Sequence, residues 1–357
     1  MEQNTHYRHG LHFKPSHNPT NPPSLVKSRG GRKKHTYVKV GNDRSIGLLH
    51  NFPSLSHKPQ TSVTPVTSVT PVTPVTPVTQ VTPVTAVVAP VTAVVAPVKR
   101  ALLIGINYIG STNALNGCIN DIHNINGILT THYNFKSENI TLMSDDQEGD
   151  MKPTKKNILD QIERFVSLTQ PGDELYAHYS GHGTSVPSLD HDEDLNPETP
   201  GQDDALCPCD FDDYDGDTGF ITDDVLRQLL VDRIPTGAKL RAFFDCCHSG
   251  SALDLPFLFK KGEEYVQVEP LDKESPDCLL ISGCKDYQTS ADAYINGQYS
   301  GALTWAISQA LTSSKEIPTS WKDFLYVIRH LLYTKKYTQI PMLSIGDRRI
   351  ADEPIDL

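Results

Sequence analysis

The sequence predicts an α/β fold in which a mainly parallel sheet is covered by helices on both faces. Short apolar runs bounded by polar residues recur after residue 98, as is typical of strands that are buried on both faces. Segments with helical apolar periodicity alternate with these runs, and this alternation predicts a parallel sheet. Residues 1–98 carry neither pattern, so we place the folded part at residues 99–357.

The first predicted elements follow the order strand, helix, strand, helix. KRALLIGINY at 99–108 is a continuous apolar run, and an apolar stripe over 118–129 marks the helix that follows it. NITLM at 139–143 is the next strand. Thr154 is then a candidate helix N-cap, because it directly precedes an apolar stripe over 154–165.

The same alternation continues to the end of the chain. DELYAHY at 173–179 and KLRAFFD at 239–245 are predicted strands, and a short helix over 222–229 lies between them behind Thr222. CLLIS at 278–282 is the last predicted strand. Two more helices are predicted at 301–311 and 321–332.

Composition divides the chain into three parts. Residues 1–60 have a basic cluster and no apolar periodicity, so we expect a disordered arm. Residues 61–98 repeat Val-Thr-Pro, and proline at every third position favours a polyproline II spacer. Residues 1–98 hold ten Lys and Arg against two acidic residues, whereas residues 99–357 hold 22 against 41. The sequence is thus a basic arm joined to an acidic body.

Composition also argues against several classes of protein. The opening residues lack a basic stretch followed by an apolar core, and the longest apolar stretch, Ala86–Val98, is interrupted by Thr92 and two prolines. We therefore expect neither a secretory signal nor a membrane-spanning helix. Seven cysteines, an odd number at low density, indicate reduced thiols in the cytoplasm rather than disulfides. We expect a monomer that binds neither nucleic acid nor a membrane.

A histidine and a cysteine follow two of the predicted strands. His182 comes directly after the strand 173–179, and Cys247 comes after the strand 239–245. In a parallel sheet, active residues lie at the carboxyl ends of strands, so these two are a candidate base and nucleophile. We interpret Cys246, which faces the other way, as a small core residue. A zinc site is disfavoured because the cysteine spacings do not match those of zinc clips.

The residues around this pair resemble those of a known family. HYSGHG at 178–183 together with DCCHSG at 245–250 resembles the metacaspases, the caspase-like cysteine peptidases of protists, fungi and plants. The resemblance implies a caspase-like three-layer sandwich with a sheet of six to eight strands, a larger part at 99–257, a linker at 258–276 and a smaller part at 277–357. The short linker favours type I, although the arm lacks the zinc finger of some type I members. Matching segments also include KRALLIGINY (99–108), LNGCINDI (115–122), PGDELYAHYSGHG (171–183), FITDD (220–224), FFDCCHSGSALDLPF (243–257) and ISGCKDYQTSADA (281–293).

The resemblance assigns roles to individual residues. His182 and Cys247 match the catalytic dyad, and the backbone amides of Gly183 and Cys247 match the oxyanion hole. No Asn or Asp is identified as a third triad member. The substrate pocket before the scissile bond would be lined by Cys118, Asp121, Ser180 and Asp245. Carboxylates at the base of a pocket require a cationic guest, so we expect Arg or Lys there.

A long acidic segment suggests a metal. Between Val186 and Leu226 there are 14 Asp and Glu and no Lys or Arg, and such oxygen donors suit Ca²⁺. The stretch 213–224 resembles an EF-hand loop, but Thr218 replaces the required Gly and Asp224 replaces the final Glu. The family resemblance instead assigns calcium to Asp203, Asp223, Asp224 and Asp254.

These observations lead to one reading and one rival. We expect a calcium-dependent cysteine endopeptidase that cleaves after Arg or Lys, made as a zymogen that cuts itself, with Lys260 and Lys261 as the first candidate sites. The rival is a catalytically silent calcium-binding scaffold of the same fold, which should lack His182 or Cys247. The proline-rich arm is a candidate interaction segment in either case. The pathway, including a role in death signalling, is not indicated by the residues.

Overall fold

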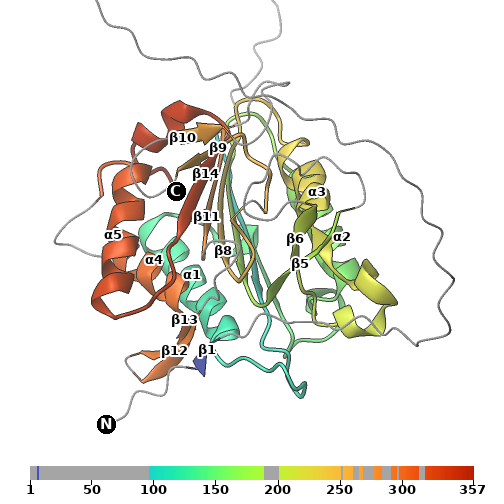
Figure 1. Cartoon of the computed structure of the whole chain (residues 1–357). Coiled ribbons are helices and arrows are strands. Elements are labelled where there is room, and N and C mark those ends of the chain that lie inside the picture. Colours follow the sequence, from blue (N-terminus) through green and yellow to red (C-terminus); the bar gives the residue numbers. More distant parts are fainter. Residues whose placement is uncertain are drawn as a thin grey trace, which may run out of the picture. The chain divides into compact units, whose positions relative to one another are not determined.

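The computed structural model describes most of the predicted folded part of the chain. Its main sheet contains eight strands in the order β10, β9, β14, β11, β8, β4, β2, β3 (Figure 1). The described residues are 6–7, 96–188, 201–250, 252–259, 265–267, 277–283, 291–295, 297–312 and 318–357. The strands of the main sheet are β2 (Lys99–Gly105), β3 (Ile140–Ser144), β4 (Glu174–Ser180), β8 (Lys239–Asp245), β9 (Phe257–Phe259), β10 (Tyr265–Gln267), β11 (Asp277–Ser282) and β14 (Met342–Ile345).

The predicted parallel sheet is confirmed, with an antiparallel edge added to it. Strands β11, β8, β4, β2 and β3 run parallel, and β14, β9 and β10 extend the sheet in antiparallel fashion. Strands β3, β4, β8 and β11 match their predicted ranges to within one residue at each end. The segment 258–276, predicted as a linker, contributes most of β9 and all of β10 to the sheet edge.

Alternate side chains of the central strands point into two separate cores. On β8, Leu240, Ala242 and Phe244 pack into one core, while Phe243 between them packs into the other. This period of two places one core on each face of the sheet. The three-layer arrangement is therefore confirmed. One face is covered by α2 (Lys155–Ser167) and α3 (Asp223–Leu226), and the other by α1 (Cys118–His132), α4 (Ala302–Thr312) and α5 (Trp321–Thr334) (Figure 1).

The helix predicted behind Thr222 differs from the prediction. Helix α3 has only four residues and continues as a wider π-helical turn over Arg227–Val231, in which the Asp232 amide donates to the Arg227 carbonyl at 3.0 Å. The Thr222 side chain makes no capping bond, whereas Thr154 Oγ1 accepts from its helix as predicted. An apolar stripe shows which face is buried, but it does not distinguish an α-helical from a π-helical ladder.

Two small antiparallel sheets accompany the main one. One consists of β5 (Gly183–Pro187), β6 (Gln202–Leu206) and β7 (Ile221–Thr222). The other consists of β12 (Ala291–Ile295), β13 (Gln298–Gly301) and β1 (His6–Tyr7). Nothing in the composition of residues 1–60 indicates the pairing of β1. The rest of the predicted arm, and residues 61–95 of the predicted spacer, lie outside the described residues.

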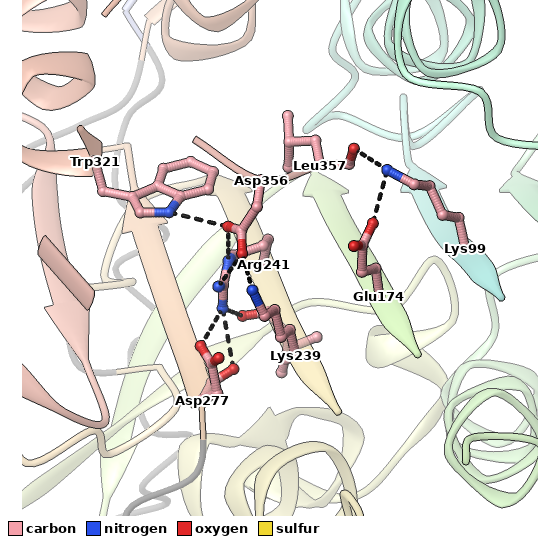
Figure 2. Close-up of polar contacts among 9 residues, drawn as sticks. Lys99, Glu174, Lys239, Arg241, Asp277, Trp321, Asp356 and Leu357 are labelled. Atoms are coloured by element: carbon pink, nitrogen blue, oxygen red, sulfur yellow. Dashed lines mark hydrogen bonds and ion pairs between the residues drawn. The ribbon is translucent and has the colours of Figure 1, made fainter. Parts of the chain in front are cut away.

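The amino ends of the main strands hold a cluster of paired charges. Arg241 on β8 is 2% exposed, and its guanidinium donates to Asp277 at 2.7 Å and to both oxygens of Asp356 at 3.0 Å (Figure 2). Lys239 also pairs with Asp356, and the Trp321 indole donates to the same carboxylate at 3.3 Å. Burial alone would lower the pKa of Arg241, but the hydrogen bonds and charge of Asp356 outweigh it and raise that pKa.

Within the part of the chain that the structure describes, every helix is too short or too polar to cross a bilayer.

Candidate active site

The two strands that precede the candidate dyad are direct neighbours. Strands β4 and β8 pair in parallel, and their last residues, Ser180 and Asp245, lie opposite each other. The segments that follow therefore leave the sheet side by side. A Cβ placed on Gly183 would overlap the carbonyl oxygen of Cys247, so the two backbones touch and only glycine fits at position 183. The structure thus brings the predicted histidine and cysteine segments together.

The imidazole of His182 has a defined orientation. Its Nε2 atom lies 2.7 Å from the carbonyl oxygen of Asn113. Because a carbonyl oxygen only accepts hydrogen bonds, Nε2 carries the proton, and Nδ1 is left as the basic nitrogen. The main-chain carbonyl of Asn113 thus takes the place of a third triad member, for which the sequence offered no side chain. The identity of residue 113 carries no signal of this role, since every residue has such a carbonyl.

Two buried tyrosines fix the backbone of His182. The Tyr108 hydroxyl accepts from the His182 amide at 2.8 Å, and the Tyr179 hydroxyl donates to the His182 carbonyl at 2.8 Å. The Tyr108 ring also lies 4.6 Å from the imidazole, centre to centre. Burial, followed by the charge of Tyr179, raises the pKa of Tyr108, so its hydroxyl stays protonated. Tyr108 is a site residue that the sequence did not point to.

The segment after β8 turns sharply at the candidate nucleophile. Cys246 packs into the core on one face of the sheet, as interpreted from the sequence. His248 adopts a left-handed conformation with φ of 47°, and the Ser249 hydroxyl donates back to the Cys246 carbonyl at 3.0 Å. The His248 ring is held by Ser185, whose Oγ lies 2.9 Å from Nδ1. The strand ends at Asp245, and Cys247 lies buried in the turn that follows.

The predicted pocket residues surround one buried carboxylate. Asp121, on the first turn of α1, is fully buried and accepts from the Ser180 hydroxyl at 2.6 Å. It also accepts from the Ser300 hydroxyl at 2.5 Å and from the Gly301 amide at 3.0 Å. Cys118, one turn earlier on α1, is buried as well. Ser300 and Gly301 were not predicted.

A second buried carboxylate lies beside the first. Asp245 accepts from the amide and the hydroxyl of Thr304, both at 2.9 Å. A Cβ on Gly301 would overlap Asp245 Oδ2 and would stand only 2.9 Å from Asp121 Oδ2, so the two carboxylates converge on this glycine. Ser300, Gly301 and Thr304 all lie in the segment 298–304. A polar strand end meets the predicted helix there, and this junction was the only signal for them in the sequence.

The convergence of two carboxylates changes their chemistry. Burial, together with the charge of Asp245, raises the pKa of Asp121 to about 8, although the hydrogen bonds from Ser180 and Ser300 oppose the rise. With this pKa, the Asp121 carboxyl is largely protonated at neutral pH. A guanidinium or ammonium group beside it would favour the ionised carboxylate.

The predicted metal ligands form a second acidic group. Carboxylate oxygens of Asp203 on β6 and of Asp223 and Asp224 at the start of α3 all lie within 4.8 Å of one another. Asp223 Oδ2 accepts from the Asp204 amide at 2.9 Å. Burial, then the charges of Asp254 and Asp204, raises the pKa of Asp223 to about 10. Asp254, with φ of 44°, is therefore part of the same electrostatic group.

The remaining predicted residues fall elsewhere. The EF-hand-like stretch folds into 3₁₀ turns (Phe211–Asp213 and Gly216–Gly219) followed by β7, and not into a loop between two helices. Lys260 and Lys261, the candidate self-cleavage sites, lie outside the described residues, as does the acidic stretch 189–200.

Comparisons with known proteins give a consistent result. The profile of the family described as "Metacaspase, peptidase C14 domain" matches residues 99–256. "Metacaspase-1" of Coccidioides immitis is 38% identical, and the alignment covers 69% of this chain and 61% of that protein. "Metacaspase-1A" of Aspergillus terreus is 37% identical over 69% of this chain and 70% of its own length. "Metacaspase-1" of Candida glabrata is 36% identical over 72% and 74%, respectively. A solved structure of a Geobacter sulfurreducens protein is 22% identical, with a TM-score of 0.49 over 72% of this chain and 97% of that one.

Proposed function

This chain belongs to the metacaspase family of cysteine-type peptidases, and on that premise we propose that it is a calcium-dependent endopeptidase that cleaves after Arg or Lys. The observation that carries the specificity is the convergence of Asp121 and Asp245 on Gly301. Two adjacent carboxylates in a buried pocket favour a cationic side chain and disfavour an acidic one. The pocket should therefore reject the Asp that true caspases accept.

The proposed reaction uses His182 and Cys247 in two stages. His182 Nδ1 takes the thiol proton of Cys247, and the thiolate attacks the carbonyl carbon of the bound Arg or Lys residue. The amide N–H groups of Gly183 and Cys247 stabilise the resulting oxyanion. When the C–N bond breaks, the imidazolium gives its proton to the leaving amine and a thioester remains.

Water then completes the cycle. His182 takes a proton from the water molecule, whose oxygen attacks the thioester carbonyl. As the C–S bond breaks, the proton returns from His182 to the Cys247 thiolate, and the amino-terminal fragment leaves with Arg or Lys as its new carboxyl terminus. The hydrogen bond from Nε2 to the Asn113 carbonyl supports this sequence, because it keeps Nδ1 available in both stages.

A fluorogenic peptide assay tests this function. Peptides with Arg, Lys or Asp before the reporter group are compared with calcium and with excess chelator. We expect cleavage of the Arg and Lys peptides only, and only with calcium. Comparable cleavage after Asp would contradict the pocket, and the absence of any cleavage, of peptides or of the chain itself, with calcium present would favour the silent scaffold.

We also propose that Asp203, Asp223, Asp224 and Asp254 hold the Ca²⁺. Closely spaced carboxylates fit a hard cation, and burial, followed by the negative charges of Asp254 and Asp204, raises the pKa of Asp223. A bound calcium ion would supply the positive charge that lets them ionise together. Asp254 follows Cys247 by seven residues, so its capture would also order the segment after the nucleophile.

Calorimetry tests the calcium proposal directly. The double variant Asp223→Asn/Asp224→Asn should lose calcium binding and calcium-dependent activity. Asp213→Asn/Asp215→Asn, which removes two exposed charges from the same acidic segment, is the matched control and should keep both. Full activity of the unmodified protein in excess chelator would remove the proposal.

Self-cleavage is proposed at Lys260 or Lys261. Adding calcium should shorten the chain and create N-termini at Lys261 or Gly262, as read by mass spectrometry. The Cys247→Ala protein should stay intact under the same conditions. Cuts at acidic residues, or cutting of the Cys247→Ala protein alone in solution, would show that the cleavage is not its own. Partners of the proline-rich arm and a cytoplasmic location also remain proposals, and a pull-down with residues 1–98 tests the first.

A further inference from the structure

A cavity of about 1060 Å³ opens at the carboxyl end of α5. Tyrosine rings and cationic side chains dominate its lining, and none of the described residues that line it is acidic. It therefore has the opposite character to the pocket built on Asp121 and Asp245. The lining residues that matter here are Tyr326, Arg329, His330, Tyr333, Lys336 and Tyr337.

The least exposed cation in the lining is Arg329, which is half-buried. Its Nε and Nη2 atoms donate to the carbonyl oxygen of Pro341 at 2.9 and 2.7 Å. A carbonyl satisfies hydrogen bonds but does not neutralise a charge. None of the ion pairs among the described residues includes Arg329. Burial lowers the pKa of Arg329, which shows that its positive charge is partly desolvated. An anion in the cavity would offset that cost.

Two further groups make the rim positive and polar. His330 and Lys336 are exposed, and Lys336 is held in a left-handed turn with φ of 65° directly after the helix. Tyr333 is 79% exposed, so its ring and hydroxyl face solvent at the same rim. Guanidinium, imidazole, ammonium and phenol groups are all donors suited to a carboxylate.

The cavity lies at the catalytic end of the sheet. Gln339, in its lining, donates to the Gly283 carbonyl at 3.0 Å, and the Gly283 amide donates to the Phe244 carbonyl at 2.8 Å. Phe244 precedes Cys247 by three residues. Strands β14 and β8 are separated only by β11, a spacing of about 10 Å. An extended peptide advances about 3.3 Å per residue, so about three residues span the two strand spacings from β8 to β14, and about five extend beyond β14 towards the turn that lines the cavity.

We propose that this cavity binds an acidic side chain of the substrate polypeptide, about three to five residues from the cleaved bond. The proposal rests on the proposed function, since it assumes a peptide that is anchored by Arg or Lys in the pocket of Asp121 and Asp245. The enzyme would then recognise two side chains of the substrate. The basic one positions the scissile bond, and the acidic one sets which residues of the peptide lie along the cleft.

A matched peptide series tests the proposal. Each quenched-fluorescence peptide carries one Arg and a single Glu, scanned over the five positions on either side of it, and a partner peptide replaces that Glu with Gln. The readout is the ratio of kcat/KM between partners. We expect the Glu peptide to be cut about tenfold faster at one or two neighbouring positions, the equivalent of ~1.4 kcal/mol.

Variants then locate the origin of the preference. His330→Gln/Lys336→Asn should reduce the ratio to below about twofold; asparagine is chosen because it tolerates the left-handed conformation of residue 336. Lys335→Gln is the matched control, because Lys335 is the adjacent exposed cation but lies against the Trp305 ring and outside the lining. It should keep the full ratio.

Several outcomes would overturn the proposal. They are the absence of a Glu preference at every position, its survival in the double variant, or its equal loss in Lys335→Gln. Failure of the proposed function looks different, because then neither partner peptide is cut after Arg. In that case the same peptides, carrying a fluorophore, are bound to the Cys247→Ala protein and followed by polarisation. Equal affinity of the Glu and Gln peptides would reject the cavity independently of catalysis.

Discussion

The two ends of the main sheet treat buried charge in opposite ways. At the amino ends of the strands, Arg241 is surrounded by carboxylates that neutralise it, from Asp277 and Asp356. At the carboxyl ends, Asp121 and Asp245 are held by hydroxyl and amide donors, and burial, followed by the charge of Asp245, raises the pKa of Asp121. Arg241 at the amino end is thus neutralised by carboxylates of the chain itself, whereas the proposed function assigns a substrate cation to the carboxylates at the carboxyl end. On that proposal, the first arrangement serves stability and the second serves recognition.

The largest expected effect tests whether the carboxyl end alone holds the chemistry. Cys247→Ala and His182→Ala should each lower kcat/KM by at least about 10³-fold, because each removes a member of a unit that works together. Melting temperatures should change by only about 2 °C, since neither change alters a charge pair. Cys246→Ala is the control and should keep its activity per folded molecule. An active Cys247→Ala enzyme would transfer the nucleophile to Cys246.

The next effect should appear in stability and not in catalysis. Arg241→Met removes the cation and leaves Asp356 and Asp277 facing each other near a buried site, which typically costs about 3–5 kcal/mol in unfolding free energy. Chemical denaturation measures this cost, and kcat/KM per folded molecule should not change. Asp356→Asn is a milder test in the same direction. Arg349→Met, which breaks the exposed pair with Asp347, should have no measurable effect. A similar loss in both arginine variants would abolish the contrast between the two ends.

Neutralising one carboxylate at the carboxyl ends of the strands should reduce catalysis and leave stability intact. Asp245→Asn keeps the shape of the pocket but removes the charge that faces the substrate cation. We expect kcat/KM for Arg and Lys peptides to fall by the equivalent of about 2–5 kcal/mol. The unfolding free energy should stay constant or rise, because one source of repulsion is gone. A destabilised Asp245→Asn protein that still cleaves Arg peptides well would show that this charge is structural.

The smallest effect is a pH dependence confined to the carboxyl end. Asp121 has a pKa of about 8 in the folded protein against an ordinary value of 3.8, so the folded state binds the extra proton between these limits. Stability should therefore fall as the pH rises from about 4 towards 8. The affinity for Arg peptides should rise through pH 8, by at most about tenfold per pH unit. Thermal unfolding and KM measured from pH 6 to 9 would show both trends.

The matching control for the pH experiment is Asp121→Asn. Asp223, with its pKa of about 10, holds a proton over the same range, so both proteins carry Asp223→Asn when their unfolding is followed. In that background Asp121→Asn should lose most of the pH dependence of its unfolding temperature, although its cleavage of Arg peptides should be weak. An unchanged pH profile in Asp121→Asn would mean that the titrating group lies elsewhere.

The sequence was most informative where structure follows from strand ends. The runs 173–179 and 239–245 predicted two parallel neighbours, and the geometry of a parallel sheet then brings Ser180, His182 and Asp245 to one edge. Helix α1 was predicted from its apolar stripe. These inferences need only the period of a strand or helix and the direction of a sheet, whereas the place of Asp121 in the pocket came from the family resemblance alone.

Other features depend on contacts that no local pattern encodes. The Asn113 carbonyl that orients His182 is 69 residues away in sequence, and Ser300 meets Asp121 across 179 residues. Strand β6 was not predicted, because its two aspartates belong to the acidic segment that was assigned to a metal, and it is recognisable only once β5 and β7 flank it. The π-helical turn after α3 likewise follows from bonds to residues outside the apolar stripe.

The close packing around Gly301 restricts the codons that the gene can use at this position. A side chain at this position would occupy the space of the carboxylates of both Asp121 and Asp245, so even alanine should deform the pocket. All four glycine codons share their first two bases, and any change to either of those bases encodes another residue or a stop. In a saturation screen that selects for cleavage after arginine, codon 301 should therefore accept third-base changes only. Exposed positions outside both sites, such as Leu168 at the end of α2, should accept many replacements in the same screen.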